Sequence, residues 1–248
     1  MFEAFLWGLF AASSLLVGAA IVFARAPTPK VLGLVMGFGS GVLLSAVSFE
    51  LVDEAVQTAG GLRGAALGFF TGALVFFAGD TLIARLGGQH ADASRPDAPG
   101  GEQPSPALPI VLGTVLDGVP ESAVLGLTLL QTGKIGASML VAVFVSNLPE
   151  SVAATTDLLQ DRWTKARVIA LWVGVTIVSG LAAGAGFALL DGASPWLLAF
   201  MFAFAGGAIL AMLATSMMPE AYETAGRVVG LVVTLGFAVS YGITWVAG

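Results

Sequence analysis

Long apolar stretches alternate with short polar breaks along the whole chain. Five stretches contain no Asp, Glu, Lys, Arg or His, and they cover residues 4–24, 31–49, 168–190, 192–219 and 228–248. About 20 consecutive apolar residues form a helix that crosses the hydrocarbon core of a bilayer. A membrane β-barrel would instead show alternating strands of about 10 residues. With three further stretches, the pattern predicts an all-α integral membrane protein with eight transmembrane helices, at 4–24, 31–53, 64–84, 108–131, 135–158, 167–190, 195–218 and 227–247.

The composition agrees with this prediction. Hydrophobic residues make up 57% of the chain and charged residues 10%, whereas a soluble domain carries about 25% charged residues. The chain has no cysteine, which excludes disulfides and thiolate metal ligands. The predicted partner is therefore the lipid bilayer, and no nucleic-acid partner is expected.

One connection between the predicted spans differs from the others. Residues 85–107 are rich in glycine and proline and contain the single histidine, His90. Such a segment buries too little apolar surface to fold, so a flexible loop is predicted. This loop and the other odd-numbered connections hold eight of the ten Lys and Arg residues. Because cytoplasmic loops are enriched in basic residues, we expect a multi-pass cell-membrane protein with this loop in the cytoplasm and both termini outside.

An internal repeat links two of the predicted spans. Phe38–Gly60 aligns with Phe204–Gly226 at a constant offset of 166, and eight of the 23 aligned residues are identical. These segments belong to spans two and seven, which run in opposite directions, so the repeat is inverted. The chain then divides into three helices (1–84), the loop (85–107), two central helices (108–158) and three helices (159–248). An inverted 3+2+3 bundle is typical of transporters, which bind their substrates at the repeat interface.

The central pair of helices carries the candidate chemistry. Each has a glutamate directly after a proline, Pro120-Glu121 in the first and Pro149-Glu150 in the second. A charged side chain at the bilayer centre costs about 2.5–3.5 kcal/mol, and neither helix contains a Lys or Arg that could pair with these acids. A bound cation would offset this cost. For either motif alone, a proline kink beside a protonated glutamate is an equal alternative, but the matched pair favours a functional site.

Further oxygen donors share the helix faces of the two glutamates. Asp117 lies four residues before Glu121, while Ser146 and Asn147 lie four and three residues before Glu150. Residues three or four apart share one face of a helix. Each proline also leaves the carbonyl four residues earlier without its helical donor. The sequence therefore predicts an oxygen-rich cation site.

The remaining acids give weaker signals. Glu50 ends an uncharged run, and it either lines a vestibule of this site or lies at the membrane interface. Asp80 is predicted to pair with Arg85 near the cytoplasmic side. Four acids near helix ends are predicted to be interfacial: Asp53, Glu54, Glu220 and Glu223.

These motifs resemble those of the ZIP (Zrt/Irt-like) metal transporters. That family carries His-Asn-x-Pro-Glu-Gly in its fourth span and a related motif in its fifth, and the corresponding segments here are Asp117–Ser122 and Ser146–Ser151. The resemblance implies a homodimer that transports divalent cations, with the central helices shifting against the outer ones. The metal ligands that it implies are Asp117, Glu121, Asn147 and Glu150, with Ser146 and Glu50 as further candidates.

The chain departs from the family motifs at the histidine positions. Asp117 and Ser146 stand there, Gly118 stands at an asparagine position, and Thr215 and Ser216 replace an acid of the seventh span. The second metal site of the family is therefore predicted to be lost. Carboxylates and carbonyls suit magnesium, calcium and manganese, and imidazole suits zinc, iron and copper, although carboxylates bind zinc too. The expected substrates are zinc, manganese, iron, cadmium or cobalt, with no obligatory cofactor.

Two other functions are consistent with the same residues. One is a related permease for a non-metal substrate, in which the acids relay protons or bind an organic cation. The other is a non-transporting, metal-binding membrane scaffold. An enzyme is not predicted, because the chain contains no His-Glu-x-x-His, no Gly-x-Ser-x-Gly and no Walker loop.

Overall fold

The computed structural model describes residues 1–58, 62–85 and 107–247, and these residues form helices and short connections with no strand. Residues 86–106, which include His90 and most of the predicted loop, lie outside the described residues. The elements are α1 (Phe2–Arg25), α2 (Pro29–Ala46), η1 (Val47–Val52), α3 (Asp53–Thr58), α4 (Leu62–Ile83), α5 (Ala107–Thr132), α6 (Ala137–Gln160), α7 (Lys165–Leu189), α8 (Pro195–Met212), η3 (Leu213–Met217), α9 (Met218–Ala225), η4 (Gly226–Val228) and α10 (Val229–Ala247).

Six helical stretches in the described part of the chain are long and apolar enough to cross a membrane. They are Phe2–Arg25, Pro29–Thr58, Arg63–Ile83, Ala137–Gln160, Lys165–Leu189 and Pro195–Val246. The all-helical prediction is thus confirmed, and the stretches are compatible with a multi-pass membrane protein. The division into eight spans differs in two places. The last stretch contains α8, α9 and α10 together, and α5 is not among the six.

The two segments of the sequence repeat have the same local structure. Helices α2 and α8 each have 18 residues and begin with a proline. The preceding hydroxyl caps each first turn: Thr28 accepts from the main-chain N–H of Val31 at 3.4 Å, and Ser194 accepts from that of Leu197 at 3.3 Å. Such caps satisfy N–H groups that have no partner within a helix. Both helices then pass directly into a π-helix, η1 after α2 and η3 after α8.

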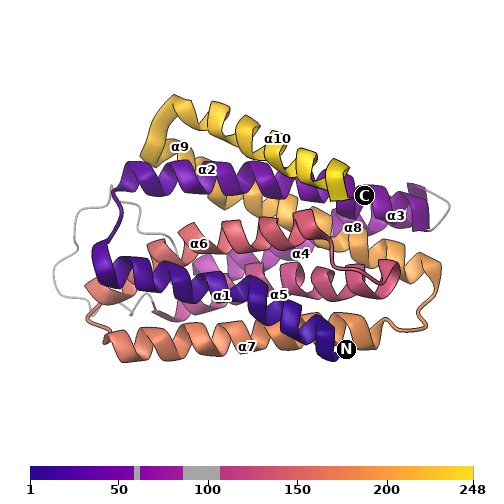
Figure 1. Cartoon of the computed structure of the whole chain (residues 1–248), viewed down its shortest axis with the longest axis horizontal. Coiled ribbons are helices and arrows are strands. Elements are labelled where there is room, and N and C mark those ends of the chain that lie inside the picture. The colour runs from indigo at the N-terminus through magenta and orange to yellow at the C-terminus, as the bar shows by residue number, and fades with distance from the viewer. Residues whose placement is uncertain (59–61, 86–106, 248) are drawn as a thin grey trace.

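Helices far apart in the sequence pair along the bundle. Helix α2 packs on α10 and α9, α4 packs on α8, α1 packs on α7 and α6, and α5 packs on α7. Figure 1 shows α10 and α2 along one edge of the bundle and α7 along the opposite edge. The N- and C-termini lie at the same end.

Glycines allow the α2–α10 pair to approach through their main chains. Gly41 of α2 faces the carbonyl of Val233, and Gly236 of α10 faces the carbonyl of Phe38. A Cβ atom at either glycine would overlap the facing oxygen. Small residues permit this close contact in membrane helices.

The α4–α8 pair makes matching contacts. Gly207 of α8 faces the carbonyl of Phe69, and Gly72 of α4 faces the carbonyl of Phe204. Gly207 and Phe204 are the residues that the sequence repeat aligns with Gly41 and Phe38. The two helix pairs are therefore joined at equivalent positions.

Candidate cation site

The two Pro-Glu motifs lie within continuous helices that contact each other. Pro120 lies inside α5 and Pro149 inside α6, and each helix continues through its proline. Asp117 and Glu121 are therefore carried by α5, as predicted. The oxygen donors of the second motif are carried by α6.

Glu121 is the most buried acid of the pair of helices. Its side chain is 1% exposed, and Oε1 has no hydrogen-bond partner among the described residues. Burying a carboxylate oxygen without a donor is unfavourable, and nearly all buried polar atoms in proteins have a partner. An oxygen left in this way is the expected ligand of a cation or acceptor of a shared proton.

Other acids surround Glu150, which is partly buried. Its carboxylate lies within electrostatic reach of those of Asp117, Glu121 and Glu220. Asp117 in turn lies within reach of Asp80 on α4. The five carboxyl groups form a run through the bundle from α4 to α9. Because ionised carboxylates repel one another, their ionisation favours positive charge bound among them.

The acids do not all point to a single position. Among the described residues, no group of three His, Cys, Asp or Glu side chains is arranged to hold a metal ion. The carboxylates thus act on one another through charge without forming a closed ligand set. An ion there would need neutral oxygens or water to complete its shell.

The neutral donors of α6 are buried between helices. Asn147 is 4% exposed, and Ser146 is fully buried with its hydroxyl donating to the carbonyl of Val143 at 3.1 Å. The main chain of Ser146 packs against Gly39 of α2. The hydroxyl proton of Ser146 is therefore already used within its own helix.

Gly118 lies on the side of α5 that faces α7. A Cβ atom at Gly118 would lie 3.7 Å from Oγ of Ser179, which is an ordinary contact distance. The position that resembles a ligand asparagine therefore adjoins α7 in this chain.

Glu50 has partners at the start of α6. Its Oε2 accepts a hydrogen bond from the main-chain N–H of Met139 at 3.1 Å, and its Oε1 accepts one from Thr244 of α10 at 3.5 Å. The sequence predicts that Glu50 either lines a vestibule of the cation site or lies at the membrane interface. The structure instead gives its carboxylate an anchoring role between three helices, and the acids that act on Glu150 are other residues.

Sequence reasoning missed Glu220 and Asp80. The sequence predicts Glu220 at the interface and Asp80 beside Arg85, and the structure adds that they lie within electrostatic reach of Glu150 and Asp117 respectively. One signal was available for Glu220. It follows Pro219, which makes it a third Pro-Glu pair in the chain.

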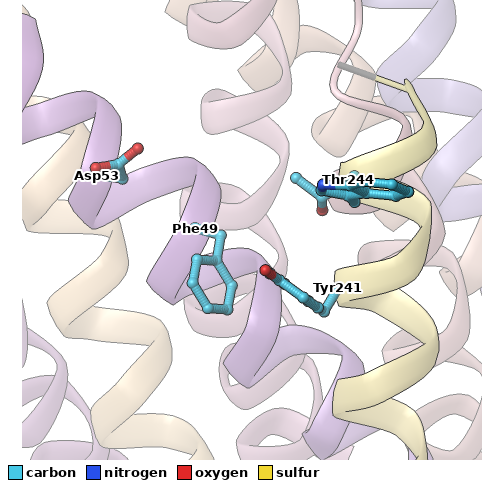
Figure 2. Close-up of a pocket in the computed structure, with 5 residues that line it drawn as sticks. Phe49, Asp53, Tyr241 and Thr244 are labelled. Carbon is cyan, nitrogen blue, oxygen red and sulfur yellow. The ribbon is translucent and has the colours of Figure 1, made fainter.

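An open pocket lies beside Glu50, between the end of the α2 segment and α10 (Figure 2). Its lining is mostly aromatic: Phe49, Asp53, Tyr241, Thr244 and Trp245. The rings of Phe49 and Tyr241 approach with centroids 4.9 Å apart. Aromatic side chains of this kind gather where membrane helices meet the bilayer interface.

Comparison with known proteins does not identify a function for this chain. No protein-family model matches the chain, and no curated protein matches it. The function therefore has to follow from the buried acids and their neighbours.

Proposed function

We propose that this protein transports divalent metal cations across a membrane through the acids of α5 and α6. Glu121 and Glu150 hold the ion, and Asp117 and Asn147 contribute to its shell. The observation that carries the proposal is the buried Oε1 of Glu121, which has no hydrogen-bond partner in the described part of the chain and lies within electrostatic reach of Asp117 and Glu150.

The charge balance of the site supports a cation substrate. Neither α5 nor α6 contains a Lys or Arg. Asp117, Glu121 and Glu150 act on one another, and intramembrane acids are costly unless they are paired or neutralised. A divalent ion cancels two of these charges at once. A passing ion is therefore stabilised without a permanent positive residue that would block its path.

The donor set favours a hard ion that keeps part of its water. All candidate ligands are oxygens, which suit manganese and magnesium better than zinc. Ions such as magnesium retain several waters and bind through one or two carboxylates. This agrees with acids that do not close around one position. Among the expected substrates, manganese fits best.

We propose the eight-span, 3+2+3 architecture of a ZIP-like transporter for the bundle. The shared π-helices of the two repeat segments support it. The matching glycine contacts of the α2–α10 and α4–α8 pairs support it as well. Both termini lie at one end of the bundle, as an even number of crossings requires.

The test is ion uptake by purified protein in liposomes. Manganese, zinc, iron(II), cobalt, cadmium, calcium and magnesium are compared for the wild type and for Glu121→Gln/Glu150→Gln. Glu223→Gln is the matched control, because Glu223 is exposed on α9. Uptake that the double variant loses and the control keeps supports the proposal. No uptake of any ion by folded wild-type protein refutes it.

A proton-linked permease for a non-metal substrate is the second candidate. The run of carboxylates from Asp80 through Asp117 to Glu150 and Glu220 has the composition of a proton relay. It is favoured by the absence of a three-residue metal group among the described residues. Transport that needs Glu121 and Glu150 but persists in a metal chelator would select it over metal transport. Metal binding without flux would indicate the scaffold.

A further inference from the structure

We infer that Glu50 is a positioning residue whose carboxylate holds the start of α6 against η1 and α10. We call its hydrogen bonds the Glu50 clasp, and we infer that this clasp keeps one end of the bundle closed. The inference rests on the proposed transport function, because closure matters only if the two ends open in turn. Glu50 lies in η1, the π-helix that continues α2.

The clasp consists of hydrogen bonds from two helices to one carboxylate. Met139 donates its main-chain N–H to Oε2 at 3.1 Å, and the side chain of Ser138 also bonds to Glu50. Thr244 adds a contact from α10 at 3.5 Å. The first N–H groups of a helix have no partner within it and carry partial positive charge, so a carboxylate is a favourable acceptor there. Beside the clasp, Ser138 and Ser240 share a hydrogen bond of 2.8 Å that joins α6 to α10.

The residue before α6 is a glycine that leaves room for the carboxylate. A Cβ atom at Gly136 would lie 2.7 Å from Oε2 of Glu50. Any larger residue would push the carboxylate away from the N–H of Met139. Glu50 can therefore approach the main chain at this point only because residue 136 is a glycine and has no Cβ atom.

Behind the clasp the bundle is filled with apolar side chains. The side chains that follow on α2 and α6 towards the acids are Leu43, Ala46, Met139, Ala142 and Val143, and all are fully buried in one apolar cluster. By contrast, Asp117 and Glu150 are only partly buried. Water and ions are therefore excluded from the acids on the Glu50 side by apolar packing that the clasp fastens.

The clasp exists in only one of the two repeat segments. The residue that the offset of 166 aligns with Glu50 is Ser216 of η3. Ser216 cannot supply a carboxylate to the start of another helix. The Glu50 contact therefore has no carboxylate counterpart at the repeat-related position, and opening the Glu50 end requires the bonds to Glu50 to break.

Cysteine labelling tests the clasp without reference to ion flux. The chain has no cysteine, so Ser45→Cys introduces a single, nearly isosteric thiol. Ser45 is fully buried in α2, just before η1, and its hydroxyl has no hydrogen-bond partner in the described structure. A charged, membrane-impermeant thiol reagent is applied to proteoliposomes that carry this variant alone or with Glu50→Gln, Gly136→Ala or Glu54→Gln. Glu54 is the matched control, because its carboxylate accepts a bond from Thr58 of its own helix, at 3.1 Å, and from no other residue that the structure describes.

If the clasp keeps this end closed, Glu50→Gln and Gly136→Ala should each raise the labelling rate by about tenfold or more, because charge-assisted hydrogen bonds are lost. The control Glu54→Gln should leave the labelling rate unchanged. If Glu50→Gln does not fold, as judged by size-exclusion profile, Gly136→Ala decides alone. Equal rates in Gly136→Ala and Glu54→Gln overturn the clasp. Ion uptake is measured on the same vesicles. If the labelling rate changes as predicted but no variant takes up ions, the clasp stands and the transport function is refuted. If the protein takes up ions but the labelling rate does not change, the transport function stands and the clasp is refuted.

Discussion

Gly236 of α10 packs directly against the main-chain carbonyl of Phe38 in α2. We expect Gly236→Ala to destabilise the protein by about 1–3 kcal/mol, the usual cost of overpacking a close contact. The added methyl group would overlap a carbonyl oxygen, which belongs to the main chain and cannot rotate away. Thermal unfolding in detergent measures the effect.

Gly242 provides the control for this substitution. It lies in the same helix, and a Cβ atom there meets nothing within 4 Å. Gly242→Ala should leave stability unchanged or raise it by up to about 1 kcal/mol. Gly72→Ala in α4 should match Gly236→Ala, because Gly72 faces the carbonyl of Phe204 in the same manner. Equal effects of Gly236→Ala and Gly242→Ala would contradict the close approach of the helices.

At a pH high enough to ionise the three acids, Glu121→Gln should stabilise the protein in the absence of metal. The substitution keeps the shape of the side chain and ends the repulsion of an ionised Glu121 with Asp117 and Glu150. We expect an increase of roughly 1–2 kcal/mol in the free energy of unfolding. The unfolding midpoint of the wild type should also rise when manganese is added, since a ligand of the native state stabilises it. A variant that still responds to manganese like the wild type would place the ion elsewhere.

Replacing Asp117 by histidine should shift the ion preference towards zinc. Imidazole nitrogen is a better ligand for zinc than for manganese. Asp117 is only partly buried, so the larger ring can be accommodated. Competition of zinc against manganese uptake measures the change. Asp53→His, at an exposed position hydrogen-bonded to Gln57, controls for an added surface histidine and should leave the preference unaltered.

Glu220→Gln should reduce uptake while leaving ion selectivity intact. Glu220 acts on Glu150 from α9, so its charge helps to attract the ion without belonging to the α5–α6 motifs. Initial uptake rates at several ion concentrations should show weaker apparent affinity. Glu223→Gln, on the same helix but exposed, should behave like the wild type. A full loss of transport in Glu220→Gln would make Glu220 a principal ligand instead.

The helices and the first pair of acids could be predicted because their signals are local. Apolar runs, the Pro29 and Pro195 starts and the Pro-Glu motifs are all visible in short windows of sequence. Asp117 and Glu121 therefore fall on one helix as expected. The predicted boundary between 195–218 and 227–247 falls at α9 and η4, the short elements that precede α10.

The neighbours of the site could not be predicted in the same way. Asp80 meets Asp117 only because α4 and α5 contact each other, and sequence spacing carries no such information. One partner of Glu50 is a main-chain N–H, that of Met139. Every residue except proline has one, so no pattern of side chains could single it out.

The π-helices η1 and η3 have a consequence for the angular phase of the helices they interrupt. In an α-helix each residue advances by about 100°, from 3.6 residues per turn, whereas a π-turn spends an additional residue on the same turn. The side chains that follow Met217 are therefore rotated about the helix axis by about 100° from the directions they would have if α8 continued as an unbroken α-helix. A projection that assumes unbroken α-helix therefore misplaces Glu220 by about this angle. The five residues of η3 thus act as an angular offset before the third Pro-Glu pair of the chain, whose Glu220 lies within electrostatic reach of Glu150.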